Sequence, residues 1–294
     1  MGDVAPAAPP MTVAQALREA AERLSATSDT ARLDAELLMA HALGATRSDL
    51  LLRHQRDASP PAFAALVERR LAHEPVAYIT GQQEFFGLPF HVTRDVLIPR
   101  GDSEVLVEAA LAARPDARRV LDCGTGSGAL LLAVLAHLPE ARGVGIDRSE
   151  AARAVAAGNA DALGLSPRAT LLLADWDQPG WTDALGEPFD LILANPPYVE
   201  DAAPLAASVR EHEPAGALFA GADGLDAYRV LIPQLAGLLA PGGAALIEIG
   251  ATQGDAVSAL AADSGFSVRR HRDLGNRERA LELKIPLGFC GTGD

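Results

Sequence analysis

The sequence predicts an α/β protein in which a small helical bundle precedes a doubly wound, mostly parallel sheet. From about residue 100 onward, short apolar runs alternate with helical patterns. Several of these runs are continuously apolar, as in parallel strands that are covered on both faces. Before residue 75, apolar residues recur instead at helical spacing. A chain of 294 residues suits two domains.

The helical bundle is expected within residues 12–73. Thr12 can cap a first helix, and Gly44 is a natural end for a second. Ser48 and Ser59 are the candidate caps of two further helices. The bundle either packs only as a structural domain or docks a macromolecular substrate, and the sequence leaves both readings open.

The domain organisation follows from changes in composition along the chain. Residues 76–98 contain β-branched and aromatic residues with Gly81 and Gly87 between them, which predicts a hairpin linker. The last two strands of the sheet have no long helix between them, so an antiparallel end is expected. The strands are predicted at 119–122, 143–147, 169–173, 189–194, 244–249, 266–270 and 279–284. The domains are expected at 1–10 (disordered tail), 11–75 (bundle), 76–98 (linker), 99–285 (sheet domain) and 286–294 (tail).

Charge and cysteine content narrow the classes of function. The net charge is −14, from 39 acidic against 25 basic residues, which disfavours a nucleic-acid partner. Cys123 and Cys290 form neither a metal pattern nor a disulfide framework, and we expect reduced thiols in a cytoplasmic protein without a metal site. No apolar run reaches membrane-spanning length, and the first ten residues lack the pattern of a signal peptide.

A glycine-rich loop follows the first strand of the sheet. The segment Gly124-Thr125-Gly126-Ser127-Gly128 lies between the strand ending at Asp122 and a helical pattern. Glycine allows a positive φ and a close approach of backbone to ligand. The spacing differs from the dinucleotide fingerprint G-x-G-x-x-G, and it favours S-adenosylmethionine (SAM) over NAD, which carries a pyrophosphate. A tight strand–helix turn without a ligand is the alternative reading.

Two further strand ends supply groups that suit an adenosine ligand. Asp147 ends the next strand about 20 residues beyond the loop and can accept hydrogen bonds from both ribose hydroxyls. Asp175 can bind the adenine amino group, and Trp176 can cover the ring. Taken singly, Asp147 could be a helix N-cap and Trp176 a core residue. The three features in register favour SAM.

The stretch Asn195-Pro196-Pro197-Tyr198 follows the fourth strand, where ligands bind in such sheets. The prolines fix φ and have no N–H, and the first one holds Asn195 extended. The side-chain carbonyl of Asn195 and the backbone carbonyl of Pro196 can therefore converge on one planar NH₂ group, with Tyr198 against its flat face. Two acceptors favour a pyramidal nitrogen and stabilise the positive charge that develops on it during methyl transfer. A glutamine amide, adenine N6 and guanine N2 all fit this logic, and a proline-terminated strand with a buried tyrosine is the alternative without chemistry.

The chain resembles the HemK/PrmC family of protein-(glutamine-N5) methyltransferases over about residues 12–284. The resemblance is carried by "ARLDAELLMAHALG", "PVAYITGQQEFFGLPFHVTRDVLIPR", "LDCGTGSGAL", "GIDRS", "NPPYV", "EHEPAGALFAGADGLDAYR" and "GNRERALELK". The "NPPY" motif is shared with many amino-methyltransferases, whereas "ITGQQEFFGLPFHV" with "LIPR" and the "EP" to "YR" stretch are much more specific.

This resemblance implies a Rossmann-like class I SAM-dependent methyltransferase sheet with an N-terminal helical bundle and a β-hairpin linker. It implies transfer of a methyl group from SAM, with S-adenosylhomocysteine as product, to the glutamine of a Gly-Gly-Gln motif in class-I peptide-chain release factors. Residues 124–128, Asp147, Trp176 and Asn195 would contact SAM, and residues 195–198 would hold the glutamine. The bundle and hairpin would grip the release factor, and we expect a monomer.

The sequence departs from the family pattern at two places. The usual Arg-Pro-x-Thr-Glu is here "RGDSE", so that Gly101 replaces Pro and Ser103 replaces Thr. Cys123 stands where leucine is common. Residues 211–213, Glu-His-Glu, are interpreted as a surface loop over the pocket, and His212 has no spaced histidines with which to bind a metal.

Three other functions compete with release-factor methylation. A glutamine of a ribosomal protein would fit the same pocket. A nucleic-acid amino-methyltransferase is opposed by the acidic composition, and a non-catalytic SAM-binding scaffold by the intact Asn195–Tyr198 motif.

Overall fold

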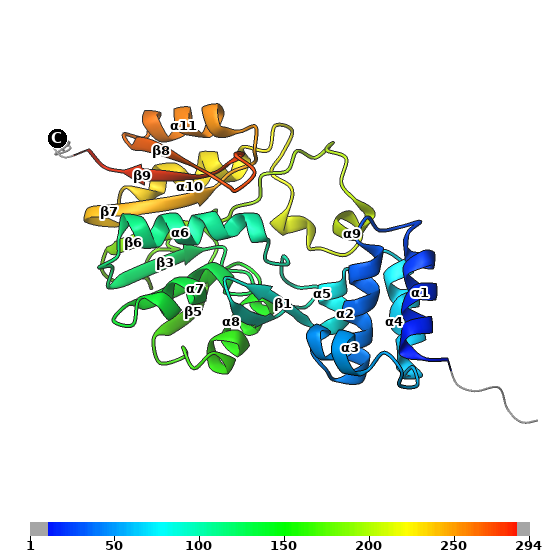
Figure 1. Ribbon diagram of the computed structural model, residues 1–294. Helices are drawn as coiled ribbons and strands as arrows, with labels where there is room; N and C mark the ends of the chain where they lie inside the picture. The colour runs from blue at the N-terminus through cyan, green and yellow to red at the C-terminus, as the bar shows by residue number, and fades with distance from the viewer. Residues whose placement is uncertain (1–10, 287–294) are drawn as a thin grey trace, which may run out of the picture. The chain divides into compact units, whose positions relative to one another are not determined.

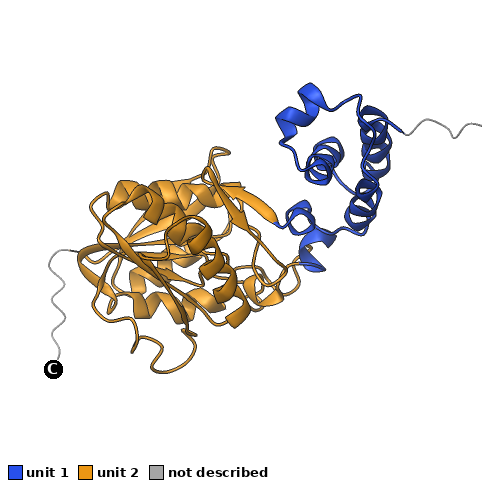
Figure 2. Ribbon diagram, turned by 90° about the horizontal axis from the view of Figure 1, so that it is seen from below, with its two compact units in different colours: residues 1–81, 206–212 blue, residues 82–205, 213–294 orange. Residues whose placement is uncertain are grey.

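The computed structural model describes residues 11–286, and Figure 1 shows the course of the chain through its helices and strands. Two units are present, one built from residues up to 81 together with 206–212, the other from 82–205 together with 213 onward (Figure 2). The predicted tails at 1–10 and 287–294, and Cys290 within the second, lie outside the described residues.

The first unit is the predicted helical bundle. Thr12 caps its first helix in a capping box, because its hydroxyl accepts from Gln15 N at 3.3 Å while Gln15 Oε1 accepts from Thr12 N at 2.8 Å. Gly44 ends the second helix at a φ of 63°, as predicted. The core is formed by side chains such as Leu17, Leu38 and Phe63. The helices are α1 (Val13–Leu24), α2 (Ala31–Leu43), α3 (Arg47–Arg53), α4 (Ala62–Leu71), α5 (Val76–Thr80) and, from the later segment, α9 (Ala207–Arg210).

Three local predictions in this region are wrong. Thr46, not Ser48, caps α3, since its hydroxyl accepts from Asp49 N at 3.0 Å. Helix α4 begins after Pro61 without a side-chain cap, so Ser59 does not cap it. Residues 76–80 form the helix α5 instead of a strand. Pro75 is the residue that precedes this helix, and Gly81 ends it with a φ of 73°. The predicted hairpin is present but shorter, with strands β1 (Gln82–Phe85) and β2 (Leu88–His91).

The second unit contains the predicted doubly wound sheet. Its seven strands, among the described residues, lie in the order β5-β4-β3-β6-β7-β9-β8. Strand β9 runs antiparallel to both β7 and β8, which confirms the antiparallel end. The strands are β3 (Arg119–Cys123), β4 (Arg142–Asp147), β5 (Ala169–Leu173), β6 (Phe189–Ala194), β7 (Leu239–Glu248), β8 (Ser267–Arg272) and β9 (Glu278–Lys284).

Helices cover both faces of this sheet, which explains its continuously apolar strands. Val120 and Leu191 face a core formed with α6, α7 and α8, whereas their neighbours Leu121 and Ile192 face a core formed with α10 and α11. The helices are α6 (Glu104–Ala113), α7 (Ala129–His137), α8 (Glu150–Ala162), α10 (Asp226–Leu235) and α11 (Gly254–Asp263), with short 3₁₀ turns η1 (Gly101–Ser103) and η2 (Ala215–Ala217).

The strand order sets the position of the site. Strands β3 and β6 are neighbours, and the chain winds outward from them in opposite directions. In open α/β sheets such a reversal leaves a crevice at the carboxyl ends of the two strands. Both the glycine loop after Cys123 and the motif that begins at Asn195 lie at this edge. Within residues 11–286, no helix is long and apolar enough to cross a membrane.

Candidate active site

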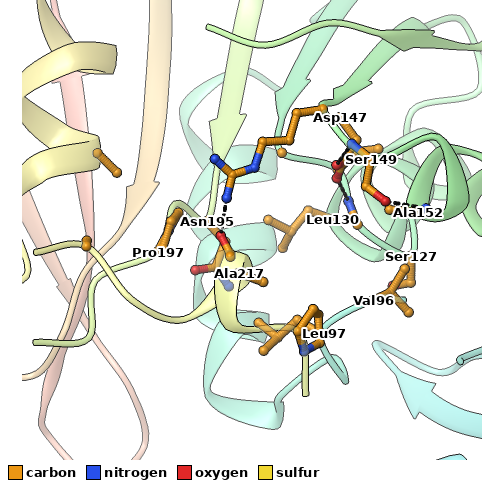
Figure 3. Close-up of a pocket in the computed structure, with 18 of the residues that line it drawn as sticks. Val96, Leu97, Ser127, Leu130, Asp147, Ser149, Ala152, Asn195, Pro197 and Ala217 are labelled. Atoms are coloured by element: carbon orange, nitrogen blue, oxygen red, sulfur yellow. Dashed lines mark hydrogen bonds between the residues drawn. The ribbon is translucent and has the colours of Figure 1, made fainter. Parts of the chain in front are cut away.

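A cavity of about 420 Å³ lies at this edge of the sheet (Figure 3), within the range typical of small-molecule sites. Most of the residues predicted from the sequence line it: residues 124–127, Asp147, Asp175, Trp176, Asn195 and Pro197. Gly128, Pro196 and Tyr198 do not line it, although they belong to the same two loops. The sheet therefore brings the predicted glycine loop, acidic strand ends and proline motif to one cavity.

The glycine loop is folded back onto the end of strand β4. The amides of Gly124 and Thr125 both donate to the Ile146 carbonyl, at 3.0 and 2.8 Å. Gly124, Gly126 and Gly128 have φ values of 75°, 54° and 83°, a region that favours glycine. A Cβ on Gly124 would lie 3.0 Å from Cη2 of Trp176, so the glycine also lets the indole approach the loop.

Asp147 is fixed by both of its carboxylate oxygens. Oδ2 accepts from Gly126 N at 2.9 Å, and Oδ1 accepts from Ser149 N at 2.8 Å. Figure 3 shows Asp147 and Ser149 side by side at the cavity wall. The N-cap of α8 is Ser149, whose hydroxyl accepts from Ala152 N at 3.2 Å, so the N-cap reading of Asp147 is wrong. Each Asp147 oxygen keeps a second lone pair with which to accept a hydroxyl.

Asp175 and Trp176 follow strand β5. The Asp175 carboxylate accepts from Asp177 N at 3.0 Å, which fixes the turn. Trp176 packs on the core beside α10 and also lines the cavity, so the core reading is confirmed and its contact with the adenine ring stays a prediction. Gln234 supports it, because its Nε2 donates to the Trp176 carbonyl at 3.2 Å.

The Asn195–Tyr198 segment leaves β6 and pairs with a later part of the chain. Val199 N donates to Leu218 O at 2.8 Å, and Ala220 N donates to Val199 O at 2.9 Å. The half-buried Asn195 has no side-chain hydrogen bond to any described residue, which leaves its amide available to a ligand. Burial, followed by the charge of Glu248, raises the pKa of Tyr198 well above its usual range, so its hydroxyl stays protonated.

The segment after His212 forms another wall of the cavity. The interpretation of residues 211–213 as a surface loop over the pocket is wrong for Glu213, which is buried, whereas Glu211 is exposed. The side chain of Glu213 is 1% exposed and forms an ion pair with Arg100, and its Oε2 accepts from Ile98 N at 3.4 Å. Further along the same segment, the carbonyl of Gly216 accepts from Arg148 Nη2 at 2.9 Å. Arg100 and Ser103 of the "RGDSE" stretch both line the cavity.

Three buried polar residues near the site were not assigned a role from the sequence. Asp122, at the end of β3, accepts from the Thr125 hydroxyl at 2.7 Å, and burial raises its pKa to about 7. Asn159 and Glu248 are 1% and 3% exposed and lie on α8 and β7. Isolated polar residues in helical or apolar patterns give no sequence signal of burial, whereas Asp122 was visible as the polar end of a strand. Among residues 11–286, no group of three or more histidine, cysteine or acidic side chains is arranged to hold a metal ion.

The residues of the cavity fit SAM. Asp147 offers two oriented acceptors, Trp176 a flat apolar face, and the glycine loop a close approach to its backbone. The apolar remainder includes Leu97, Leu130 and Phe219, as in most sites for small molecules.

Comparison with known proteins agrees with this arrangement. Residues 15–81 match the PrmC N-terminal domain, and residues 115–264 match a methyltransferase domain. A protein of Cereibacter sphaeroides named "Release factor glutamine methyltransferase" is 45% identical over 284 residues, which cover 94% of this chain and 99% of that protein. One of the same name from Moorella thermoacetica is 48% identical, with 85% and 90% covered.

Among solved structures, the catalytic domain of hMettl16, crystallised with an RNA hairpin, superposes with a TM-score of 0.54 at 16% identity, covering 74% of this chain and 84% of that domain. At this identity the similarity concerns the fold, which is that of Rossmann-like class I methyltransferases.

Proposed function

Because the chain belongs to the family of release factor glutamine methyltransferases, we propose that it methylates the side-chain amide nitrogen of the glutamine in the Gly-Gly-Gln motif of class-I release factors. The methyl donor is SAM, the product S-adenosylhomocysteine, and the compartment the cytoplasm. The observation that carries the proposal is the Asn195–Tyr198 segment at the edge of a cavity that fits SAM, in a chain 45% identical to a relative over nearly its whole length.

The methyl donor is bound by the glycine loop and by the ends of β4 and β5. Asp147 accepts the two ribose hydroxyls, and its hydrogen bonds to Gly126 N and Ser149 N hold the carboxylate in place. Asp175 and Trp176 bind the adenine. When bound, SAM supplies an electrophilic methyl group on its sulfonium sulfur.

The substrate amide is held by the residues after β6. Asn195 Oδ1 and the Pro196 carbonyl accept the two N–H groups of the glutamine, and Tyr198 supports the turn that carries them. An amide nitrogen is a weak nucleophile because its lone pair is delocalised into the carbonyl. Two fixed acceptors restrict rotation, favour a pyramidal nitrogen and stabilise the positive charge that develops on it. The methylated nitrogen then loses a proton readily, so no strong general base is required.

The test uses labelled SAM, the whole protein and an intact class-I release factor. We expect label in the tryptic peptide that contains Gly-Gly-Gln, at one methyl group per chain. A release factor with glutamate in place of the motif glutamine is the matched control and should take up no label. Label on a ribosomal protein, or on RNA, with none on the release factor would overturn the proposed substrate. SAM binding without transfer to any of these would indicate a scaffold.

A further inference from the structure

Tyr198 is held from outside the cavity by a short segment that follows strand β7. Gln253 Nε2 donates to the Tyr198 carbonyl at 3.0 Å and to the Gly224 carbonyl at 3.2 Å. Gln253 Oε1 accepts from Gly250 N at 3.0 Å. Both ends of the Gln253 amide are therefore engaged, and the donating end joins the backbone after Asn195 to the loop before α10.

Glu248 holds the other end of the same tyrosine. Ala194, just before Asn195, is paired with Ile247, so Glu248 lies beside the start of the Asn195–Tyr198 turn. The Tyr198 hydroxyl donates to Glu248 Oε1 at 3.4 Å, a long hydrogen bond. Glu248 is itself fixed, because its backbone carbonyl accepts from the hydroxyl of the fully buried Tyr228 at 2.9 Å.

The surroundings of Glu248 raise the pKa of its carboxyl, so it keeps a proton to a higher pH than an exposed glutamate does. Burial and, after it, the charge of Asp102 raise the pKa, which is about 7 in the folded protein. The Ser103 hydroxyl, Arg279 and Tyr198 act in the opposite direction. Arg279 is paired with Asp102 at 2.8 Å, so much of its charge is already balanced. Below pH 7 the carboxyl is mostly protonated and lies against the Tyr198 hydroxyl without a buried charge.

The loop at Gly224 packs closely against this support. A Cβ on Gly224 would lie 2.4 Å from the Tyr198 carbonyl oxygen and 2.8 Å from Gln253 Nε2. These distances are below any real Cβ contact, so the loop at Gly224, the Gln253 amide and the Tyr198 backbone form one closely packed group. Neither Gln253 nor Glu248 lines the cavity.

We propose that Gln253 and Glu248 are positioning residues that hold the Asn195–Tyr198 turn in the conformation in which its oxygens bind the substrate amide. They touch neither methyl donor nor amide and act through Tyr198. The kinetic test of this inference measures methyl transfer to a release factor and therefore rests on the proposed function. It predicts that their loss impairs transfer while leaving SAM binding intact, since a misplacement of about 1 Å at a reacting group can cost about 100-fold in rate.

The experiment compares Gln253→Glu with Gln234→Glu, a matched control. Both changes remove an amide donor that binds a backbone carbonyl, Tyr198 O in one case and Trp176 O in the other. For Gln253→Glu we expect kcat to fall about 10- to 100-fold, with the Kd for SAM within twofold of the unmodified protein. For Gln234→Glu we expect the Kd for SAM to rise several-fold. Glu248→Gln, which keeps the shape of the side chain, should lower kcat less than Gln253→Glu.

A second readout does not depend on activity. Hydrogen exchange of peptides spanning residues 195–201 should become faster in Gln253→Glu and stay unchanged in Gln234→Glu, with thermal unfolding recorded for each variant. Unchanged exchange there, or the same pattern of kcat and Kd in both variants, would overturn the positioning role. Failure of the unmodified protein to methylate release factors would instead remove the proposed function, and the exchange experiment would still test the support of Tyr198.

Discussion

The side chain of Asn159 on helix α8 forms a two-way hydrogen-bonded pair with the backbone of His91 on strand β2. Its Oδ1 accepts from His91 N at 2.8 Å, and its Nδ2 donates to His91 O at 3.0 Å. The same Nδ2 donates to the carbonyl of Ser127 in the glycine loop at 2.8 Å. One buried amide thus joins the hairpin to the glycine loop, for which we propose binding of the methyl donor.

Replacing Asn159 should loosen this connection. In Asn159→Ala the buried Ser127 carbonyl loses its hydrogen bond from Nδ2, and two part-buried hydrogen bonds to the His91 backbone are lost. We expect the free energy of unfolding to fall by about 2–4 kcal/mol, given about 1–3 kcal/mol for a buried group left unpaired and less for each part-buried bond. Urea unfolding measures the loss, and titration calorimetry should show weaker SAM binding. Ser166→Ala on the exposed surface, whose hydroxyl makes only a 3.5 Å contact, is the control and should change stability little. Equal stability of the two variants would contradict the role of Asn159.

Asn195→Ala tests the amide-binding turn directly. The variant loses one of the two acceptors that we propose for the substrate amide, and kcat should fall by about 10²–10³-fold, as when an oriented hydrogen-bonding group is removed from an active site. SAM binding should weaken by no more than a few-fold, because the glycine loop and Asp147 remain. Single-turnover methylation together with calorimetry separates the two effects, and near-normal turnover would refute the mechanism.

Asp147→Ala should act on the methyl donor instead. Hydrogen bonds to a charged group contribute about 1.5–3 kcal/mol each, so we expect the Kd for SAM to rise at least about tenfold. Asp147→Asn keeps one side-chain oxygen, so its Kd for SAM should lie between those of the unmodified protein and Asp147→Ala. Isothermal titration measures both variants, and an unchanged Kd would show that the ribose is bound elsewhere.

Glu248 makes stability depend on pH. Its pKa is raised from 4.5 to about 7 in the folded protein, so between these values the folded chain keeps a proton that the unfolded chain has lost. Stability therefore falls as pH rises from about 4.5 to about 7 and then levels off, by at most about 3 kcal/mol from this group. In Glu248→Gln the fall should be smaller. Urea unfolding at pH 5 and pH 8 tests this. If the free energy of unfolding changes equally between these pH values in both proteins, Glu248 does not contribute to the pH dependence.

Gly224→Ala tests the close packing at Tyr198. Both Gly224 and Gly265 have positive φ, 69° and 86°, but only Gly224 has neighbours where a Cβ would lie. Gly265→Ala should cost about 1–2 kcal/mol from backbone strain alone. Gly224→Ala should cost clearly more and lower kcat. The difference in unfolding free energy between the two variants, measured by chemical unfolding, gives the steric cost at Gly224. Equal losses of stability in both variants would indicate that the loop at Gly224 adjusts freely.

The sequence predicted those parts of the molecule that depend on local pattern. The seven strands, the capped helix after Thr12 and the reversal of winding all follow from periodicity and from turn residues. The cavity could be anticipated because the carboxyl ends of parallel strands meet at one edge, which brought Asp147, Trp176 and Asn195 together.

The unpredicted features depend on packing between distant segments. Glu248 and Gln253 lie 50 and 55 positions after Tyr198, which they support, and Asn159 is 68 positions from His91. Nothing in the sequence near these residues marks them as buried. Glu213 was wrongly interpreted as a surface residue because its partner, Arg100, lies 113 positions earlier, and only the fold brings the two charges together. The predicted cap of α3, Ser48, is wrong because Thr46, two residues earlier, caps the helix instead.

The helical unit also takes in residues 206–212, which leave the sheet unit after Leu205 and return to it at Glu213. Within it, His212 Nε2 lies 3.2 Å from the Ala72 carbonyl. The backbone therefore passes from one unit to the other three times. A single protease cut after Gly81 would not separate them, and a fragment ending there would lack part of its own fold, so a separately expressed bundle should carry a grafted copy of 206–212.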